Sequence, residues 1–338
     1  MPFRSNVLLH MQRVSSLLPY FDAEAALDLA TLQLKISARN RSFQFTSKYY
    51  YRIDDRIVYS STIPTDFFGY VGFLGWLPYP SKQWELVRDK LVFKQYCLRH
   101  GIRTPEFWLP SSGELQDVLI KERTSSFGHG IKGPFVSLPA RRTASAEVGK
   151  VIFEKFIFGR AAKALYWDDE LICLEIIDSP VVTGDGKKTI RELVEDCRPG
   201  TEFLPDWMAV TDLVAYQGKS LDSVLSVGET LVVDFKYGSR VRPRIWKNHN
   251  VARQYQNTEI GKQFVEAGRI FWEGIPEAIR PATVSTVDAV IDAEDRVWFL
   301  EMNSNPLLHP DIYLPMFRTL FGPENNDIST RPETPDIR

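Results

Sequence analysis

Cysteine is scarce in this sequence of 338 residues, and long apolar runs are absent. The three cysteines, Cys97, Cys173 and Cys197, are odd in number and lack the spacing of metal ligands. A disulfide-stapled domain and a cysteine-rich zinc site are therefore excluded, and reduced thiols in the cytosol are the simplest account. No stretch approaches the roughly 20 apolar residues that cross a bilayer, and the N-terminal segment lacks the apolar core of a signal peptide. The sequence predicts a soluble, cytoplasmic protein.

A strong excess of one charge is also missing. Lysine and arginine number 41 against 43 aspartates and glutamates, for a net charge of -2. This balance excludes a general attraction to nucleic acid or to anionic membranes. We also find no Ser/His/Asp or Cys/His set for nucleophilic catalysis. The expected partner is a small-molecule or peptide substrate, and a homodimer is left open.

The C-terminal part of the chain contains a hairpin that directs acidic groups to one place. Segment 288–306 reads as two apolar strands, and a two-residue turn at 294–295 would set Asp288 directly opposite Glu301. Side chains paired in this way have Cβ atoms roughly 5 Å apart, and Asn303 shares their face. Two opposed carboxylates repel unless a cation lies between them, and such oxygen ligands suit Mg²⁺. Taken alone, the acids also fit polar positions at a strand edge.

A second cluster combines a lysine with a loop of small residues. Residues 118–121 form a short apolar strand that ends in Lys121, and small residues are frequent from 125 to 130. Glycines let backbone N–H groups approach a phosphate, hydroxyls add donors, and the lysine supplies a point charge. The loop is no Walker motif, because the lysine precedes the glycines. By itself, this stretch also fits an ordinary hairpin with a solvated lysine.

Together with two further motifs, these clusters resemble the ATP-grasp superfamily of carboxylate-amine ligases, over about residues 84 to 306. Asp89 and Lys90 belong to an expected helix from 84 to 100, which precedes a Gly-Ile-x-x-Pro stretch ending at Pro105. The segment 151–160 is similar to the hinge strand that holds adenine in that superfamily. The four motifs follow one another in the order of the family.

The resemblance implies roles for individual residues. ATP would be bound by Lys90, Lys121, Ser125, Ser126, Gly128, Gly130, Glu154, Lys155, Phe156, Ile157, Lys163 and Lys236. The cofactor Mg²⁺, or Mn²⁺ in its place, would be bound by Asp288, Glu301 and Asn303.

The fold class that the resemblance implies is α+β, with ATP between two antiparallel sheets. Residues 1–104 would form an N-terminal substrate domain, 105–152 a lid and 153–321 a large subdomain with the metal site. The remaining residues, 322–338, are rich in Pro, Asn, Asp and Thr and are expected to be disordered.

Two more stretches resemble cyanophycin synthetase and D-alanine:D-alanine ligase. In segment 180–194 a glycine turn leads into a helix whose capping box would pair Thr189 with Glu192. Segment 234–247 begins with Asp-Phe-Lys236 and continues with alternating arginines on one face of an extended strand. A solvated basic strand edge fits that alternation equally well.

The implied activity is the ATP-dependent coupling of a carboxylate to an amine through an acyl phosphate, with release of ADP and phosphate. Amino acids or peptides are the favoured substrates. The catalytic groups would be Arg242, Arg244 and Lys236, and the substrate would be bound by Arg240, Asn305 and His309.

Two departures keep other functions open. Ala161 stands where relatives carry an acid that holds ribose, and Thr286 where D-alanine:D-alanine ligase carries an arginine. A phosphotransferase acting on a small polyol or sugar is one alternative. A nucleotide-binding regulator without chemistry is another, although it would have no need of all three metal ligands.

The first 80 residues carry weaker signals. We expect a helix over Ala23 to Leu34 and a hairpin over Phe43 to Tyr59. The glycine-spaced aromatic stretch 67–80 fits either core packing or an acceptor groove.

Overall fold

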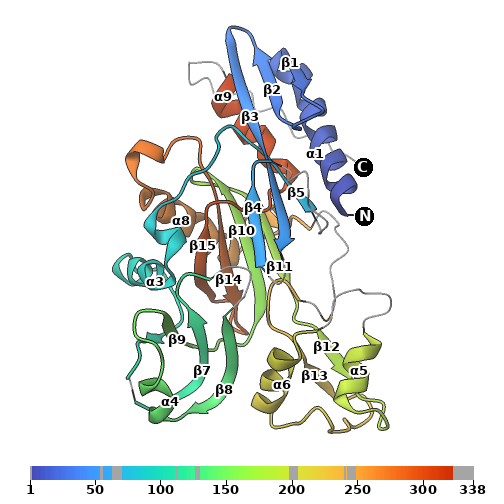
Figure 1. Ribbon diagram of the computed structural model, residues 1–338, viewed down its shortest axis with the longest axis vertical. Coiled ribbons are helices and arrows are strands. Elements are labelled where there is room, and N and C mark those ends of the chain that lie inside the picture. Colours follow the sequence, from blue (N-terminus) through green and yellow to red (C-terminus); the bar gives the residue numbers. More distant parts are fainter. Residues whose placement is uncertain are drawn as a thin grey trace. The chain divides into compact units, whose positions relative to one another are not determined.

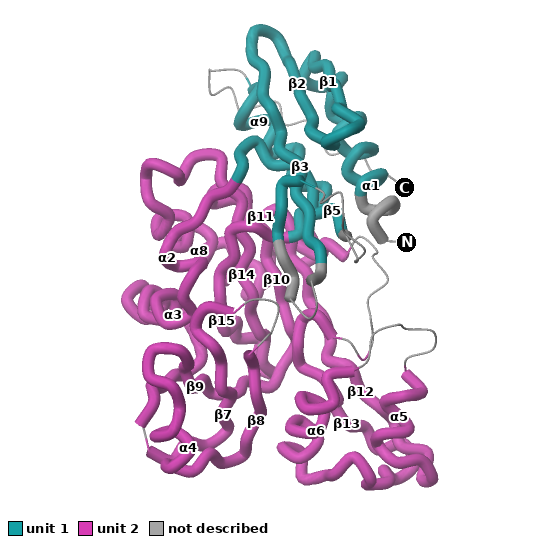
Figure 2. Tube along the Cα trace, in the orientation of Figure 1, with its two compact units in different colours: residues 1–80, 307–338 teal, residues 81–306 magenta. Residues whose placement is uncertain are grey.

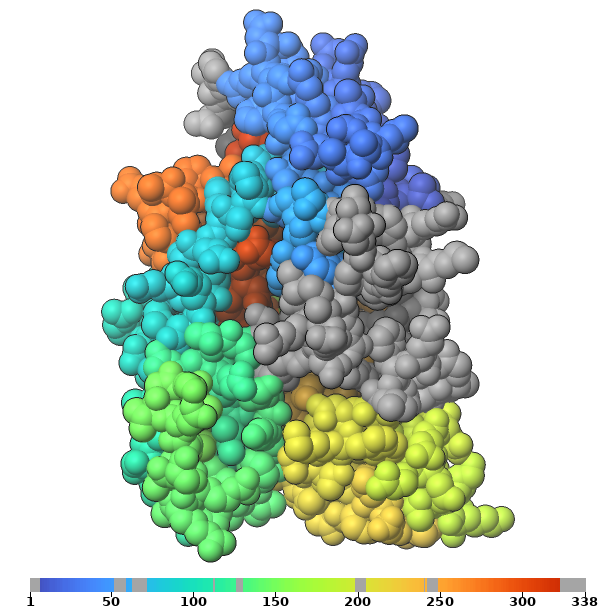
Figure 3. Space-filling view, in the orientation of Figure 1, coloured from blue at the N-terminus to red at the C-terminus, as the bar shows by residue number. Residues whose placement is uncertain are grey.

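A computed structural model of the chain describes residues 2–53, 56–62, 71–111, 113–125, 130–197, 205–239, 241 and 249–322. It divides into two compact units, Met1–Pro80 with Leu307–Arg338, and Ser81–Pro306 (Figure 2). Atoms outside the described ranges are grey in the space-filling view (Figure 3). Helices accompany antiparallel strand pairs throughout the described ranges, so the α+β expectation is confirmed. The functional division at residues 104, 152 and 321 stays a prediction.

The first unit is built on a five-stranded antiparallel sheet (Figure 1). Its elements are α1 (Pro2–Leu17), a 3-10 turn (Leu18–Phe21), β1 (Ala23–Leu27), β2 (Leu34–Ala38), β3 (Arg41–Ile53), β4 (Arg56–Ser60), β5 (Val71–Leu77), a second 3-10 turn (Pro310–Ile312) and α9 (Tyr313–Phe321). β3 is central because it pairs with β2, β4 and β5. Aromatic side chains fill the core, among them Phe45, Tyr49, Phe73, Trp76, Tyr313 and Phe317.

The helix expected over Ala23 to Leu34 is wrong, because this segment forms the hairpin of β1 and β2. Asp28 begins the turn: its Oδ1 accepts from the Ala30 N–H and its Oδ2 from the Thr31 hydroxyl, both at 2.8 Å. An aspartate that bonds its own backbone two residues on favours a turn over a helix, and strand pairing overrides the helix propensity of alanine. The hairpin expected over Phe43 to Tyr59 is confirmed by the pairing of β3 with β4.

In its described residues, the second unit contains two four-stranded antiparallel sheets and a two-stranded ribbon (Figure 1). The β7 sheet has the order β6 (Phe107–Trp108), β9 (Val151–Lys155), β7 (Leu115–Glu122), β8 (Ile131–Leu138). The β14 sheet has the order β11 (Glu170–Ile177), β10 (Arg160–Trp167), β14 (Val284–Ile291), β15 (Val297–Asn303). The ribbon pairs β12 (Val181–Thr183) with β13 (Thr230–Val232). The helices are α2 (Glu85–Arg88), α3 (Lys90–Arg99), α4 (Ala140–Ala144), α5 (Ile190–Asp196), α6 (Trp207–Tyr216), α7 (Ala252–Tyr255) and α8 (Glu259–Glu273), with a 3-10 turn at Glu277–Ile279.

One face of the β14 sheet packs against α3 and α8. The ring of Phe93 in α3 stacks on Phe271 in α8, with centroids 5.2 Å apart, and Phe271 in turn contacts Phe299 of β15 edge to face. The same core includes Ala162, Ala164, Val287, Ala289 and Ile291 from the central strands. Side chains alternate along a strand, so the residues between these point to the opposite face.

The hairpin turn between β14 and β15 contains three residues, not the two predicted. The Asp292 N–H donates to the Arg296 carbonyl at 3.1 Å, and Asp295 has a φ of 58°. A left-handed residue at the end of a three-residue loop is a common hairpin form. Continued without change, this turn would set Asp288 opposite Leu300.

A bulge at Leu300 restores the predicted pair of Asp288 and Glu301. Ala289 pairs with Phe299, whereas Asp288 pairs with Glu301, which leaves Leu300 as the extra residue. An extra residue on one strand shifts the alternation of its side chains. Phe299 can therefore stay in the core while Glu301 points to the face that carries Asp288.

The helix expected from 84 to 100 is interrupted at Asp89, which has extended backbone angles of φ −137° and ψ 114°. The Asp89 side chain accepts from the Leu91 N–H at 2.9 Å and so caps α3. Lys90 thereby becomes the first residue of a new helix, and Lys94 follows one turn later on the same side.

The capping box expected at the start of α5 is present. The Thr189 N–H donates to Glu192 at 2.8 Å, and the Glu192 N–H donates to the Thr189 hydroxyl at 3.3 Å. Among the described residues, no helix combines the length and the apolar character that crossing a bilayer requires.

Candidate functional site

Four charged side chains form a row across the polar face of the β14 sheet. Lys163 of β10 pairs with Glu175 of β11 on one side and with Asp288 of β14 on the other. Asp288 in turn pairs with Glu301 of β15. Directly opposed residues on antiparallel strands are close enough to interact, so the row is continuous. Its order is acid, lysine, acid, acid.

Asp288 and Glu301 ionise differently although they face each other. Burial raises the pKa of Asp288; Lys163 opposes this shift, and the charge of Glu301 adds to it. Burial also works against ionisation of Glu301, but Lys90, Lys121 and Lys163 outweigh it and hold its pKa below the usual range. Lys90 and Lys163 thus contact the carboxylate pair directly, and the charge of Lys121 acts on Glu301 from its own contact with Glu154.

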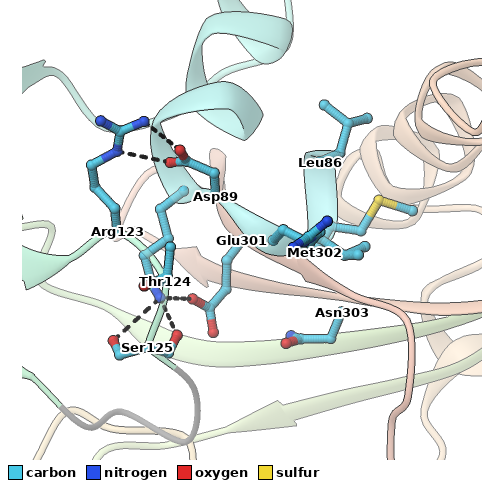
Figure 4. Close-up of a pocket in the computed structure, with 11 residues that line it drawn as sticks. Leu86, Asp89, Arg123, Thr124, Ser125, Glu301, Met302 and Asn303 are labelled. Carbon is cyan, nitrogen blue, oxygen red and sulfur yellow. Dashed lines mark hydrogen bonds and ion pairs between the residues drawn. The ribbon is translucent and has the colours of Figure 1, made fainter. Parts of the chain in front are cut away.

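Lys90 reaches this pair from the first turn of α3. Its Nζ lies 3.0 Å from Glu301 Oε2 and also donates to the backbone carbonyl of Ser125. Figure 4 shows Glu301 and Ser125 at one pocket, which Thr124 and Asn303 also line. Thr124 and Ser125, which follow the Lys121 strand, therefore border the carboxylates, and the phosphate-binding role of this loop stays a prediction.

Arg123 attaches this loop to the start of α3 (Figure 4). Its Nε donates to Asp89 Oδ1 at 3.1 Å, its Nη2 contacts Oδ2, and its carbonyl accepts from the Lys90 N–H at 3.0 Å. Burial works against ionisation of Asp89, but the bonds and charge of Arg123 keep its pKa below the usual range. Sequence reasoning did not single out Arg123.

Lys121 belongs to a buried ion cluster with Glu154 and Lys94. The Lys121 ammonium contacts Glu154 Oε1, and the Lys94 ammonium contacts Oε2. Lys94 also donates to the Thr104 hydroxyl at 3.1 Å. Lys94 is 0% exposed, Glu154 1% and Lys121 5%, so the cluster is buried and Lys121 is its most exposed member. Sequence reasoning missed Lys94, whose only signal was its spacing of four residues from Lys90.

Lys163 has a second partner besides Asp288. Its Nζ lies 2.7 Å from Asp288 Oδ1 and 4.8 Å from the centre of the Tyr237 ring. The Tyr237 hydroxyl donates to Glu175, the end of the charged row. Glu175 and Tyr237 were not predicted; the pairing register of β10 with β11 would have indicated Glu175, but nothing local indicates Tyr237.

Lys236, expected at the nucleotide, forms an ion pair outside the charged row. Its Nζ lies 2.9 Å from Asp206 Oδ2 at the N-cap of α6, and its N–H donates to Asp234 at 3.0 Å. Its neighbour Tyr237 is the residue that reaches the row. The arginines expected to follow, Arg240, Arg242 and Arg244, lie outside the described residues, as do Ser126 and Gly128.

The oxygens around Asp288 fit a divalent cation. Asp288 Oδ1 is buried and lacks an aligned hydrogen-bond donor among the described residues, although the Lys163 ammonium is close by. The Asn303 amide nitrogen donates to Asp288 Oδ2 at 3.2 Å, which leaves the amide oxygen of Asn303 as an acceptor. Two carboxylates and an amide oxygen are a donor set suited to Mg²⁺ or Mn²⁺.

The backbone donors of the predicted hinge are in part occupied. The Lys155 N–H donates to the Glu106 carbonyl at 2.8 Å, and the Phe156 N–H to the Asp117 carbonyl at 2.6 Å. Ile157, which follows them, is half-buried. Glu154 Oε2 is buried and contacts the Lys94 ammonium, so both of its carboxylate oxygens face a lysine.

The remaining predicted residues fall in different places. Gly130 has a φ of 69°, and its carbonyl accepts from the Glu122 N–H at 3.2 Å, which closes the loop after β7. Asn305 donates to the Ser304 hydroxyl at 3.2 Å. His309 belongs to the first unit, where its Nδ1 accepts from the Asp311 N–H.

Among the solved structures that are similar to this chain are ligases. No protein-family model matches the chain. No curated protein sequence matches it. A bifunctional glutathione synthetase from Pasteurella multocida is similar at 16% identity and TM-score 0.36, over 88% of this chain and 41% of that one. D-alanine–D-alanine ligase from Bacillus anthracis is similar at 12% identity and TM-score 0.34, over 70% of this chain and 64% of that one.

A third solved structure, of the ATP-grasp ligase PsnB complexed with minimal precursor, is similar at 13% identity and TM-score 0.32, over 66% of this chain and 54% of that one. The chain thus spans less than two thirds of the length of each of the three proteins.

Proposed function

We propose that this protein is an ATP-dependent carboxylate-amine ligase that activates its carboxylate substrate as an acyl phosphate. The observation that carries the proposal is that Lys90 and Lys163 contact the opposed carboxylates Glu301 and Asp288. A site with both signs of charge suits a ligand that is itself mixed, namely a polyphosphate with a divalent cation.

In this proposal the acidic residues bind the metal and the lysines bind phosphate. Asp288, Glu301 and Asn303 would hold Mg²⁺, which when bound offsets charge on the phosphates. Lys90 and Lys121 would bind phosphate oxygens, and the loop through Ser125 would cover them. Lysines that meet the transferring phosphoryl group favour its transition state because they are already in position.

Coupling would proceed in two steps. The substrate carboxylate oxygen attacks the γ-phosphorus as the bond to the bridging oxygen of ADP breaks, which yields an acyl phosphate. The amine nitrogen then attacks the acyl carbon, phosphate leaves and the amine gives up a proton. No protein nucleophile is required. Water must be kept from the acyl phosphate between the two steps, and we propose that the loop through Ser125 excludes it.

The test is ADP release from Mg-ATP with pooled amino acids and small carboxylates, with and without hydroxylamine. Hydroxylamine traps an acyl phosphate as a hydroxamate. Carboxylate-dependent ADP release with hydroxamate supports the ligase. ADP release that needs an alcohol, with a stable phosphorylated product and no hydroxamate, would instead establish a phosphotransferase.

A further inference from the structure

We propose that Lys94 is a positioning residue that sets the charge Lys121 presents to an anionic ligand, and that it acts through Glu154. The inference rests on the proposed function only in taking that ligand to be the phosphate chain of ATP. Neither the motifs nor the comparisons assign Lys94 a task.

The first step of the argument is the charge count of the buried cluster. With both lysines protonated, the cluster of Lys94, Glu154 and Lys121 carries two positive charges and one negative charge. Burial lowers the pKa of Lys94, and the charge of Glu154, which its ammonium contacts, offsets this shift in part. Burial works against ionisation of Glu154, and the two lysines together hold its pKa below the usual range. A buried cluster with an excess positive charge is costly unless an anion binds at its exposed edge.

The second step is the unequal bonding of the two ammonium groups. Lys94 contacts Glu154, donates to the Thr104 hydroxyl at 3.1 Å and lies 6.0 Å from the centre of the Phe107 ring. For Lys121, within the ranges that the structure describes, Glu154 is the acceptor that its ammonium meets. An ammonium carries three N–H donors, so Lys121 retains donors for a ligand while Lys94 is held inside the protein.

The third step is the anchoring of Lys94. Thr104 links Lys94 to β15, because the hydroxyl that accepts from Lys94 donates to the Phe299 carbonyl at 2.8 Å. Lys90, one turn earlier on α3, contacts Glu301 of the same strand. The helix therefore presents one lysine to an acid of each sheet, Lys90 to the β14 sheet and Lys94 to the β7 sheet.

The consequence concerns Glu154. With Lys94 in place, half of the Glu154 charge is already balanced, and Lys121 keeps a net positive charge for the phosphates. Without Lys94, Glu154 neutralises Lys121 completely. The affinity for anionic ligands should fall, whereas the affinity for an uncharged nucleoside should not.

The experiment measures binding to Lys94→Met by calorimetry with three probes: ATP, adenosine and inorganic tripolyphosphate. Methionine keeps the aliphatic stem and leaves Glu154 paired with Lys121, so no buried charge is orphaned. We expect ATP and tripolyphosphate to bind about tenfold more weakly and adenosine to bind unchanged. Equal losses for ATP and adenosine, or no loss for either anion, would overturn the inference.

Two further variants separate charge from packing. Thr104→Val disturbs the same buried contact without changing a charge, so its ATP affinity should stay within about twofold of the wild type. Lys94→Arg keeps the charge and should bind tripolyphosphate within about threefold of the wild type. If Lys94→Met does not fold, the arginine variant decides: a tenfold loss in folded protein contradicts the proposal.

The probes also separate this inference from the proposed function. Wild-type protein that binds tripolyphosphate but not ATP would contradict the ATP-dependent ligase, and the effect of Lys94→Met on tripolyphosphate would still decide the role of Lys94. Wild-type protein that binds neither anion would contradict both.

Discussion

Asp288 lies directly opposite Glu301 on neighbouring antiparallel strands, and each carboxylate is within 3.0 Å of a lysine ammonium, Lys163 for Asp288 and Lys90 for Glu301. In a site of this kind the protein's own cations offset the repulsion between the acids. A divalent cation that enters must compete with these lysines, and a phosphate chain that enters with it offers them new partners. Metal and nucleotide binding should therefore be coupled.

The first prediction concerns Glu301→Gln. The amide keeps the shape of the side chain but removes the charge that faces Asp288. We expect the rate of Mg-ATP-dependent ADP release to fall at least about 100-fold, because metal and Lys90 both lose their partner. Mn²⁺ binding followed by electron paramagnetic resonance should weaken in parallel. Retained Mn²⁺ affinity in this variant would show that Glu301 is not a metal ligand.

The second prediction concerns Lys163→Met and has the opposite sign. Removing the ammonium next to Asp288 removes the competitor for the cation. Mn²⁺ should bind about tenfold more tightly in the absence of nucleotide, and a gain in affinity cannot come from misfolding. Lys262→Met, at an exposed position that pairs with Glu259, is the matched control and should leave the affinity unchanged. Equal or weaker Mn²⁺ binding to Lys163→Met rules out competition.

The third prediction separates the two tasks of Asp89, which caps α3 and pairs with Arg123. Asp89→Ala loses both interactions and should lower the free energy of unfolding by about 2 kcal/mol. Asp89→Asn keeps the cap and loses the charge, so its loss should stay below about 1 kcal/mol. Urea unfolding of both variants measures the difference. Equal losses would mean that the ion pair, and not the cap, carries the stability.

The position of the carboxylate pair could be predicted from the sequence, but not the route by which the strands reach it. A two-residue turn gave the correct partner for Asp288, whereas the structure combines a three-residue turn with a bulge at Leu300. Alternation of apolar residues fixes which face a strand buries, and both routes satisfy it. Turn length and bulges depend on side-chain packing against α3 and α8, which no local pattern records.

Contacts between distant segments explain what the sequence did not predict. The motif around Lys90 predicted its place at the nucleotide. The role of Lys94 could be inferred only from its contact with Glu154, which lies on another element. The expected helix at residues 23–34 also failed because of strand pairing, here of β1 with β2, which outweighs local propensity. Local signals gave the motifs, and tertiary contacts decided their partners.

The fourth prediction concerns His10, a buried histidine of the first unit. Burial, with a smaller effect of His309, lowers the pKa of His10 from 6.5 to about 3. In the neutral ring, Nδ1 can accept from the Tyr313 hydroxyl, which lies 2.8 Å away. The same hydroxyl accepts from the backbone N–H of Trp76 at 2.9 Å. Protonated His10 cannot accept a hydrogen bond from Tyr313.

The sign of the pH effect follows from the lowered pKa of His10. Between pH 6.5 and about 3 the unfolded chain binds a proton at His10 that the folded chain does not bind. The stability due to the neutral ring is therefore complete above about pH 6.5 and declines as the pH falls, by up to about 1.4 kcal/mol per pH unit. Urea unfolding at about pH 7.5, 6 and 5, followed by tryptophan fluorescence, should show this decline in the wild type. His10→Gln should be less stable at about pH 7.5 but flatter with pH, because glutamine does not titrate; an unchanged pH slope in this variant would exclude His10 as its source.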